Sequence, residues 1–483
     1  MSDTRVLACA HLLADPRGAA AGASRITIAD GRIAAVTPDA APSEGDRLLV
    51  MSALVNAHDH GRSVRSSSIG AAGQPLEAWL HYLALFPSVD PYLGAAVALG
   101  RSALGGAGAV MMHYTRAQGF TDLPGEAREV ARAARDVGVR VGFAVSMKDR
   151  NPLVYGPSEP LLAEIPEPAR DALARQFLRT PLEPKAFIEL ADAVAEAAGG
   201  PGFDVQYGPN APQWCSDALL EAVAEASART GRRVHMHLLE TRYQRAWADA
   251  TYPEGVVKHL DAIGLLSDRL TLAHCVWARP DELALLAERG VTIVSNASSN
   301  LHLRSGMGPV AQMKAKGCRV ALGVDGKALD EDDDALRELR LAHLLHLGTG
   351  FKASVTRADI LEMALVNGRR SVTGSGEGGT VSPGAPADLL VLDWDRLEDD
   401  RLRDDLDPIE LLLTRATAHH IRELMVGGRT VVRNGALMGL DFPAARADVL
   451  AQMRAGMAAK AGLSAAMPAL DAAMARHFEP GCC

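Results

Sequence analysis

His58 and His60 stand one residue apart at the end of an apolar stretch, LVNAHDH at residues 54–60. Side chains alternate across a β-strand, so residues two apart point to the same side. Imidazole nitrogens are common metal ligands, and a strand ending in His-x-His aims two of them at one point. A short histidine pair also arises by chance, so a metal site here requires further ligands downstream.

Three later apolar stretches also end in ionisable groups. VHMHLLE (234–240) carries His235, His237 and Glu240, LAH (272–274) ends in His274, and LGVD (322–325) ends in Asp325. Taken singly, each has a structural explanation: His235 could pack or bond a carbonyl, Glu240 could cap a helix, and Asp325 could hold a turn. Their convergence with the first histidine pair at one edge of a sheet is what predicts a metal centre.

The composition narrows the class of protein. A chain of 483 residues with 48% hydrophobic side chains can bury a large core, as two or three domains or one large barrel with additions. The net charge of −9 argues against nucleic acid or an anionic membrane as partner. The chain lacks a long apolar run and a signal pattern, so we expect a cytoplasmic protein acting on a small molecule. Six scattered cysteines predict neither a disulfide framework nor a thiolate zinc site.

The elements that must position these groups alternate along the middle of the chain. Buried strands are expected at 54–58, 109–113, 139–145, 203–207, 233–238, 270–275, 291–296 and 319–325. Helical patterns separate nearly all of them, for example 127–137 and 217–230. This alternation predicts an α/β protein with a (β/α)8 TIM barrel, whose active site lies at the carboxyl ends of the strands. The interval from His60 to Gly105 is expected to form a lid over the mouth.

Both chain ends read as short strands around glycine turns. Asp30-Gly31 between alternating apolar residues predicts a hairpin, and similar patterns return at 387–393 and 424–435. We predict a small β-sandwich built from residues 1–50 and 369–442, a barrel over 51–368, and a helical tail over 443–483 that packs on the body or on a partner subunit. The acidic stretch 330–334 is expected to be a solvated face.

These segments resemble the amidohydrolase superfamily, in its cytosine deaminase and chlorohydrolase-like branch. The similarity follows the family's order over almost the whole chain, through NAHDH (56–60), HLLET (237–241), AHC (273–275), SNLHLRSG (299–306), LGVDG (322–326) and GAPADL (384–389). The resemblance implies a metal-dependent hydrolase, and together with the apolar tail it favours a homodimer or higher homo-oligomer.

The resemblance also implies that one divalent metal is held by four side chains, His58, His60, His237 and Asp325. Three nitrogens and one oxygen with room for water suit Zn2+ and do not exclude Fe2+ or Mn2+. Such a metal lowers the pKa of bound water from about 15.7 toward about 7. Asp325 would accept the proton of the water, His274 would orient the hydroxide and polarise the substrate carbon, and Glu240 would move a proton onto the ring or leaving nitrogen.

The fourth strand of the predicted barrel bears on whether the site holds one metal ion or two. Relatives such as dihydroorotases and hydantoinases bridge a second ion with a carboxylated lysine on that strand, whereas here it ends VQYG (205–208). The nearest lysine, Lys148, follows the third strand and is expected to contact substrate or solvent. One metal is therefore favoured.

Two segments depart from family members that act on purines. A Pro-His-x-Pro segment is replaced by PNAP (209–212) with Asn210, and Ser295 stands where many members have a histidine. Both imidazoles give way to shorter uncharged groups, which counts against guanine- or adenosine-type recognition. The predicted substrate-binding residues are His113, Asn210, Trp214, Ser295, Lys148 and Arg62. A cationic rim of Arg62, Arg65 and Lys148 is a hypothesis for a negatively charged substrate, and His113 could instead be a packed histidine.

We therefore predict a hydrolase of carbon–nitrogen bonds other than peptide bonds, which deaminates an aromatic or amidine-containing nitrogen heterocycle. Two alternatives use the same apparatus: hydrolysis of a cyclic amide, and removal of a ring substituent such as halide or alkylamine. A non-catalytic scaffold is a third class, but such descendants usually lose their metal ligands first, and every predicted ligand is present here.

Overall fold

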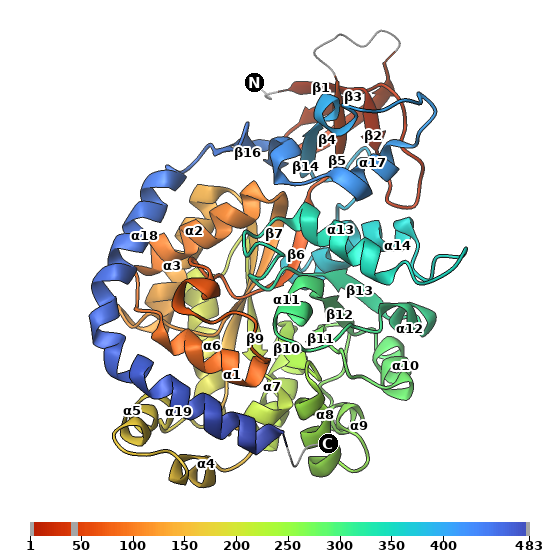
Figure 1. Cartoon of the computed structure of the whole chain (residues 1–483). Helices are drawn as coiled ribbons and strands as arrows, with labels where there is room; N and C mark the ends of the chain where they lie inside the picture. Colours follow the sequence, from red (N-terminus) through yellow and green to blue (C-terminus); the bar gives the residue numbers. More distant parts are fainter. Residues whose placement is uncertain (1–3, 40–46, 480–483) are drawn as a thin grey trace.

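A computed structural model describes residues 4–39 and 47–479 of the chain (Figure 1). Eight parallel strands form one sheet at its centre, in the order β13-β12-β11-β10-β9-β8-β7-β6. They are β6 (Leu54–Asp59), β7 (Ala107–Tyr114), β8 (Arg140–Met147), β9 (Phe203–Pro209), β10 (Val234–Leu238), β11 (Leu270–His274), β12 (Thr292–Ser295) and β13 (Arg319–Leu322). The predicted TIM barrel is confirmed, with its eight strands in the expected order.

The first and last strands of the barrel meet at their carboxyl ends. The backbone N–H of Asp325 donates to the carbonyl of His58 at 2.9 Å, and that of Val324 donates to the side chain of Asn56 at 2.9 Å. The last strand is shorter than the predicted 319–325, because Asp325 and Gly326 turn with φ of 55° and 60°. Because of this turn, the Asp325 side chain does not follow the alternation of side chains between the two faces of the strand.

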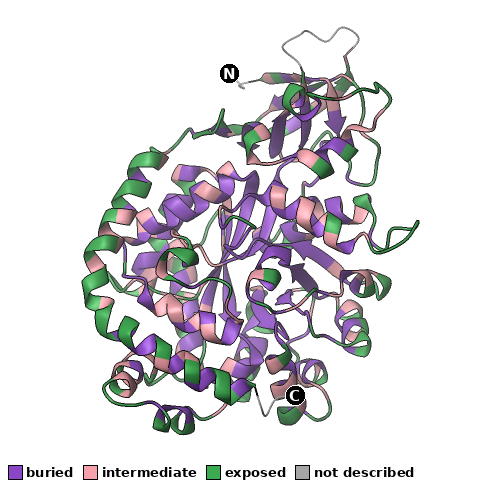
Figure 2. Ribbon diagram, in the orientation of Figure 1, coloured by how far each residue is buried: buried purple, intermediate pink, exposed green. Residues whose placement is uncertain are grey.

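Helices surround the sheet, and Figure 2 shows buried strands at the centre with exposed outer helix faces. Several of these helices begin at a capping side chain; Asp122 accepts from the backbone N–H of Gly125, and Ser216 accepts from that of Leu219. The helices of this layer are α2 (Pro91–Leu104), α3 (Leu123–Val137), α6 (Pro184–Ala198), α7 (Asp217–Thr230), α8 (Arg242–Thr251), α9 (Val256–Ala262), α10 (Pro280–Glu288), α12 (Val310–Ala315), α13 (Ala335–His346) and α14 (Arg357–Glu362).

The amino-terminal end of the barrel is plugged by α15 (Gly368–Thr373), which follows the π-helical turn η5 (Met363–Asn367). This helix contacts β6, β7, β8, β9, β12 and β13. Gly368 allows the close approach, because a Cβ there would lie 2.9 Å from the Cβ of Ala57. With one end filled by this helix, the carboxyl ends of the strands remain for chemistry.

The chain ends form two small sheets beside the barrel. One holds β1 (Arg5–Cys9), β3 (Ser24–Ala29) and β4 (Arg32–Pro38). The other holds β2 (His11–Leu13), β5 (Leu48–Ser52), β14 (Leu389–Asp393), β15 (Ile421–Val426), β16 (Arg429–Arg433) and β17 (Ala436–Leu437). The predicted hairpin turn is present, with φ of 51° at Asp30 and 74° at Gly31. Because β5 pairs with β14, the β domain is assembled from both ends of the chain, as predicted.

Short helices follow the carboxyl ends of several barrel strands. After β6 come η2 (Ser66–Ile69), α1 (Leu76–Tyr82) and η3 (Leu83–Leu85), and after β8 come α4 (Glu159–Ala163) and α5 (Ala169–Phe177). The other short helices are η4 (Pro212–Trp214), α11 (Ala297–His302), α16 (Trp394–Leu397), α17 (Pro408–Arg415) and η6 (Ala418–His420). No helix of the described chain meets the length and apolarity that a membrane span requires.

The predicted tail helices run down the outside of the molecule, drawn in blue in Figure 1. α18 (Phe442–Gly456) packs on α2, the short turn η7 (Met457–Lys460) follows, and α19 (Ala461–Phe478) contacts α1, α4 and α5. The tail therefore covers the loops that leave β6 and β8 on the side where the predicted site lies.

The acidic stretch 330–334 is not the solvated face that the sequence predicted. Glu331 is buried and accepts hydrogen bonds from Ser66 Oγ at 2.6 Å and Lys327 Nζ at 2.9 Å. Asp333 is also buried and forms an ion pair with Arg101 at 3.0 Å. These carboxylates connect the segment after β13 to residues after β6 and to α2. The partners are distant in sequence, so the local density of acidic residues does not reveal them.

Candidate metal centre and active site

Three histidines at the barrel mouth each have their Nδ1 engaged by a neighbouring group. Each Nδ1 is held by a neighbour: that of His58 lies 2.8 Å from His235 Nε2, that of His60 donates to the His113 carbonyl at 3.0 Å, and that of His237 donates to the Asn210 carbonyl at 2.7 Å. An Nδ1 engaged in this way leaves Nε2 as the nitrogen that faces the mouth, an arrangement typical of metal-ligating histidines.

Asp325 lies among these nitrogens. Its Oδ1 is 3.5 Å from His58 Nε2 and 3.2 Å from His60 Nε2, and its Oδ2 accepts a hydrogen bond from Ser299 Oγ at 2.5 Å. His60 Nε2 and His237 Nε2 are 3.4 Å apart. The structure therefore brings together all four side chains that the sequence singled out as metal ligands.

Two atoms of this cluster have unmet bonding capacity. His58 Nε2 and Asp325 Oδ1 are buried and have no hydrogen-bond partner among the described residues. Buried polar atoms are normally paired, and unpaired acceptors converging on one point are satisfied by a cation. Three imidazole nitrogens and one carboxylate oxygen match the donor set of zinc, so the residues present fit such an ion.

Two further histidines border the cluster. His237 and His274 group with His58, while His113 groups with His60 and His237, in each case with ligand-type atoms within 4.8 Å of one another. His113 is buried, and its Nε2 donates to the Gly208 carbonyl at 3.0 Å. The prediction left a packed His113 and a substrate ligand open, and this bond accounts for one of its two nitrogens.

Burial sets the protonation states of the cluster. It lowers the pKa of His58 to about 4 and the pKa values of His113, His235 and His237 well below their usual range. Burial alone would raise the pKa of Asp325, but the neighbouring imidazoles of His58 and His60 hold it well below its usual range. Neutral imidazoles beside an ionised carboxylate are the forms that bind a divalent metal.

Glu240 and His274 form a second pair beside the cluster. Glu240 Oε2 lies 3.6 Å from His274 Nε2, and Glu240 Oε1 accepts a hydrogen bond from Ser305 Oγ at 3.2 Å. His274 Nδ1 donates to Asn300 Oδ1 at 2.9 Å. Burial raises the pKa of the Glu240 carboxyl to about 7, which suits a group that gains and loses a proton near neutral pH.

The predicted substrate-binding residues divide by what they contact. The carbonyl of Asn210 accepts from the backbone and Nδ1 of His237, and its amide oxygen accepts from Ser146 Oγ at 2.7 Å. Ser295 is buried in β12, and its carbonyl accepts from the backbone N–H of Gly323 at 3.0 Å. Both residues support the positions of neighbours at the mouth through these bonds.

The remaining predicted substrate-binding residues are Arg62, Trp214 and Lys148. Arg62 donates to the carbonyl of Asp325 at 2.9 Å and lies 4.8 Å over the Trp79 ring. Trp214 packs against Tyr155, with ring centroids 5.9 Å apart. Lys148 is exposed immediately beyond β8, and the described chain supplies no ion-pair partner for it.

Sequence reasoning assigned no role to Asp59 and treated His235 as a packing residue or a partner of a carbonyl. Asp59 is buried between the two first histidines, and His235 contacts His58 instead of a carbonyl. A carboxylate inside a buried apolar strand was the available signal for Asp59, because a charge is rarely buried without partners. Ser299 and Asn300 lie in the segment that carried the family resemblance, but nothing local assigned them to Asp325 and His274.

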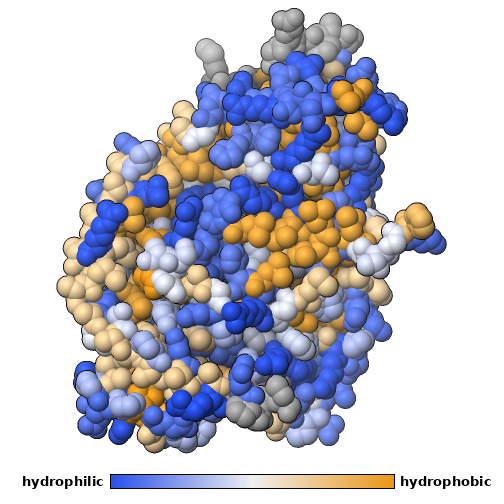
Figure 3. Space-filling view, in the orientation of Figure 1, coloured by the Kyte–Doolittle hydropathy of each residue, from blue (hydrophilic) through white to orange (hydrophobic). Residues whose placement is uncertain are grey.

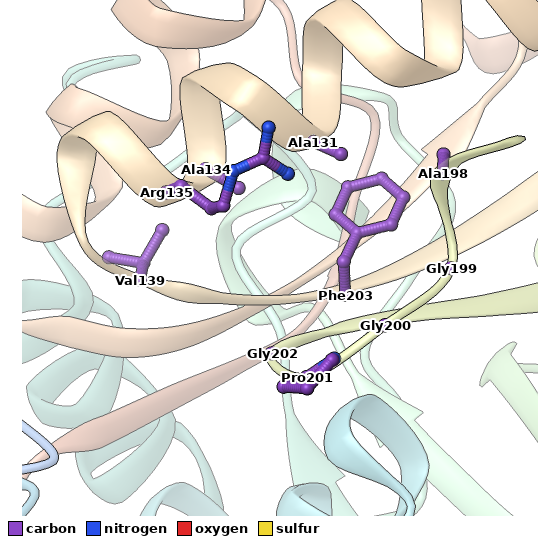
Figure 4. Close-up of a pocket in the computed structure, with 10 residues that line it drawn as sticks. All are labelled: Ala131, Ala134, Arg135, Val139, Ala198, Gly199, Gly200, Pro201, Gly202 and Phe203. Atoms are coloured by element: carbon purple, nitrogen blue, oxygen red, sulfur yellow. The ribbon is translucent and has the colours of Figure 1, made fainter.

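A separate pocket of about 250 Å³ lies at the opposite end of β8 and β9 (Figure 4). It is lined by residues from the end of α3, the start of β8 and the glycine-rich turn before β9, among them Arg135, Val139, Gly200 and Phe203. Arg135 is the one ionisable side chain in this lining, and none of the predicted site residues takes part.

Comparisons with known proteins agree with this geometry. The amidohydrolase family model matches residues 49–431. The 5'-deoxyadenosine deaminase of Methanothermobacter thermautotrophicus is 28% identical over 426 residues, which cover 86% of this chain and 91% of that protein. The enzyme of the same name from Methanopyrus kandleri is 30% identical over 398 residues, 82% of this chain and 84% of the relative.

Two solved structures share the fold. An adenosine deaminase from Xanthomonas campestris with bound zinc superimposes with a TM-score of 0.74 at 25% identity, covering 94% of this chain and 98% of that one. Atrazine chlorohydrolase from Arthrobacter aurescens, complexed with zinc, gives a TM-score of 0.66 at 21% identity, covering 93% and 99%. The chain belongs to the amidohydrolase family and is a hydrolase that acts on carbon–nitrogen bonds.

Proposed function

We propose that the protein is a zinc-dependent deaminase of an adenosine-like nitrogen heterocycle. The observation that carries this proposal is the position of Glu240, a buried carboxyl with a pKa of about 7, beside His274 and the cluster of three histidines and Asp325. Glu240 favours deamination because a carboxyl of this pKa can deliver a proton to a nitrogen. The curated relatives named as 5'-deoxyadenosine deaminases support the substrate class.

Four side chains would hold one zinc ion, His58, His60, His237 and Asp325. When bound there, zinc acidifies water toward neutral pH and polarises the electrophilic carbon of the substrate. Asp325, kept ionised by its neighbours, accepts the proton of the attacking water. His274, fixed by Asn300, orients that water, and Glu240 donates a proton to the ring or leaving nitrogen as the carbon–nitrogen bond breaks.

Product analysis over a panel of heterocycles tests the reaction. With 5'-deoxyadenosine, 5-methylthioadenosine, guanine and cytosine as candidates, we expect stoichiometric ammonia from an adenosine-type compound and no ring-opened product. The sequence expectation drawn from Asn210 and Ser295 counted against purines, so this panel also decides between that expectation and the relatives' names. Ring opening of a cyclic amide without ammonia would replace deamination with the first alternative.

Removal of a ring substituent is the second candidate. The supporting observation is the structural likeness, over 93% of this chain, to an atrazine chlorohydrolase complexed with zinc, together with a mouth that has Asn210 and Ser295 in place of two imidazoles. Chloro- and alkylamino-triazines in the same panel distinguish it, because chloride or alkylamine release without ammonia identifies this reaction.

We propose a single metal ion. No lysine occurs within β9, whose sequence is FDVQYGP, so the described strand has no side chain of the kind that bridges a second ion. Metal analysis of protein purified from zinc-limited medium should give one equivalent per chain. Two equivalents per chain, both required for activity, would contradict this assignment.

We also propose a homo-oligomer. Exposed apolar side chains gather near α11 and α13, among them Leu301, Leu329 and Leu344, and Figure 3 shows apolar surface (orange) over this part of the molecule. A contiguous exposed apolar patch is typical of a protein–protein contact. Size-exclusion chromatography with light scattering tests the proposal, and Leu344→Glu should lower the measured mass if this patch is the contact.

A further inference from the structure

A closed ring of hydrogen bonds links three segments that follow barrel strands: α1 after β6, the loop after β8, and the start of α8 after β10. The Tyr155 hydroxyl donates to Glu77 Oε1 at 2.8 Å, and Thr241 Oγ1 donates to the same oxygen at 2.5 Å. Gln244 Nε2 donates to the Tyr155 hydroxyl at 3.4 Å, and the backbone N–H of Gln244 donates to Thr241 Oγ1 at 3.2 Å. Each of the three segments therefore supplies part of one ring.

The ring ends on the backbone of Glu240. Gln244 Oε1 accepts a hydrogen bond from the backbone N–H of Glu240 at 2.8 Å, so one amide connects the Tyr155 hydroxyl to the residue proposed as proton donor. Glu240 and Gln244 are both buried. Because water does not replace a bond between buried groups, its loss would leave this N–H without a partner.

The backbone at Glu240 turns sharply and has to be held. Leu239 has a φ of 49°, in the left-handed region that residues other than glycine rarely adopt, and such a turn persists where its surroundings fix it. On one side of the turn, the Leu239 carbonyl accepts from the backbone N–H of Trp277 at 3.0 Å. On the other side, the Glu240 N–H donates to Gln244. Ser305 fixes only one carboxyl oxygen, so the position of the Glu240 backbone depends on the Gln244 bond.

The Tyr155 hydroxyl determines which way the Gln244 amide faces. Since its O–H is donated to Glu77, the oxygen accepts from Gln244, which must then present Nε2 to Tyr155 and Oε1 to Glu240. Without that hydroxyl, the flipped amide would place its NH2 group against the Glu240 N–H. The Tyr155 ring is itself packed, with its centroid 5.9 Å from that of Trp214 and 5.5 Å from that of Phe478.

We infer that Tyr155 and Gln244 are positioning residues for the proton transfer by Glu240. Tyr155 orients the amide of Gln244, and that amide holds the backbone from which the Glu240 side chain reaches His274 and Ser305. This inference rests on the proposed function, in which Glu240 donates the proton. Both residues act through Glu240, so their loss should slow the chemical step and leave metal binding and substrate binding in place.

Steady-state kinetics of Tyr155→Phe and Gln244→Leu tests the inference, with whichever compound of the heterocycle panel is turned over fastest. Tyr155→Phe keeps the packed ring and removes both hydrogen bonds of the hydroxyl. We expect kcat to fall about 10-fold in each variant, the scale of one lost hydrogen bond, with KM and zinc content unchanged. Tyr243→Phe is the matched control, because Tyr243 also packs against Phe478 but its hydroxyl accepts from Arg242, and it should keep its kcat.

A double variant separates positioning of Glu240 from general loosening of the fold. Added to Glu240→Gln, Tyr155→Phe should lower kcat by less than about 2-fold, because the proton transfer that it supports is already lost. The same loss with and without Glu240, or an unchanged kcat in both single variants, would overturn the inference.

Hydrogen-exchange mass spectrometry gives a readout that does not depend on catalysis. In peptides spanning residues 238–244, the Glu240 amide should exchange about 10-fold faster in Gln244→Leu, which removes its acceptor, and somewhat faster in Tyr155→Phe. Tyr243→Phe should leave this exchange unchanged. Faster exchange without deamination of any compound in the panel would support the positioning of Glu240 and reject the proposed reaction. Deamination with kcat and exchange unchanged in both variants would do the reverse.

Discussion

Asp59 accepts a hydrogen bond from the backbone N–H of Gly326 at 3.0 Å, which ties the end of β6 to the turn that carries Asp325. The same carboxylate accepts from the backbone N–H groups of His60 at 2.7 Å and Gly61 at 2.9 Å, and from Asn56 Nδ2 at 2.9 Å. One buried side chain therefore positions two of the proposed metal ligands, which come from opposite ends of the barrel sequence.

Asp59→Asn should weaken zinc binding. The amide keeps the shape of the carboxylate but replaces one accepting oxygen with an NH2 group that faces N–H donors. We expect zinc affinity to fall about 10- to 100-fold, the usual effect of losing an outer partner of a metal ligand. Competition with a chromophoric chelator measures it. Asp395→Asn, which alters an exposed carboxylate paired with Arg47, is the control, and equal affinities for the two variants would contradict the positioning role of Asp59.

His237→Ala and Asp325→Ala should each abolish both bound metal and turnover. Each substitution removes one of four proposed ligands and leaves the others without the geometry that zinc requires. Metal content by atomic emission and ammonia release are the two readouts. His419→Ala removes an exposed histidine in η6 and should change neither. A variant of the proposed site that stayed loaded and active would show that the ligand assignment is wrong.

Glu240→Gln should keep the metal and lower kcat by about 10²-fold or more, the usual scale for a positioned proton transfer. The glutamine preserves the size of the side chain and can still accept from Ser305, but it cannot cycle a proton. Steady-state kinetics with parallel metal analysis separates this outcome from loss of zinc. Glu225→Gln, on the exposed face of α7, is the control and should keep its kcat. Near-normal kcat in the site variant would remove Glu240 from the mechanism.

Ser305→Ala should move the alkaline limb of the kcat/KM profile to higher pH. The hydrogen bond from Ser305 stabilises the ionised form of Glu240 and so lowers its pKa, which burial has raised to about 7. Proton donation needs the protonated carboxyl, so activity falls as pH rises through this pKa. Without the hydrogen bond the pKa rises further and the active form persists to higher pH. A limb that stayed in place or moved to lower pH would argue against Glu240 as the titrating group.

Phe478→Ala should destabilise the protein by about 3–5 kcal/mol, the range for emptying a buried phenylalanine site. Phe478 is 5% exposed and packs against Tyr155 and Tyr243 with ring centroids 5.5 and 5.0 Å away. Urea denaturation followed by tryptophan fluorescence measures the change. Phe120→Ala is the matched control, because Phe120 is 57% exposed and its loss should cost less than about 0.5 kcal/mol. Similar effects of the two changes would mean that α19 is not held to the body through this contact.

The sequence was sufficient to predict the barrel strands, because the periodicity of their apolar residues reflects which residues are buried. All eight barrel strands lie where the apolar patterns predicted them, with ends that differ by a few residues. The grouping of His58, His60, His237 and Asp325 was predictable as well, because parallel strands present their carboxyl ends at one edge. Periodicity could not anticipate the turn at Asp325, which depends on a hydrogen bond to the distant His58 carbonyl.

The features that the sequence did not predict are those in which a side chain is paired with a residue from a distant segment. Glu331 and Asp333 belong to a dense run of charges that looks solvated, yet each has a basic or hydroxyl partner brought in by another segment. His235 faces His58 across the barrel interior, and nothing adjacent in sequence indicates that pairing. Whether a charged or polar side chain is buried and paired depends on the groups that surround it in the folded protein. A single sequence does not show directly which groups those are.

The pairing of β5 with β14 has a consequence for biosynthesis. Leu389 to Asp393 emerge from the ribosome about 340 residues after the strand they must join, a delay of roughly 20–70 s at typical elongation rates. Throughout that interval the edge of β5 that pairs with β14 has no partner strand, so its backbone N–H and C=O groups can pair with a strand of another chain. Productive maturation of this enzyme therefore depends on shielding the nascent amino-terminal segment, by the growing barrel or by a chaperone, until translation is nearly finished.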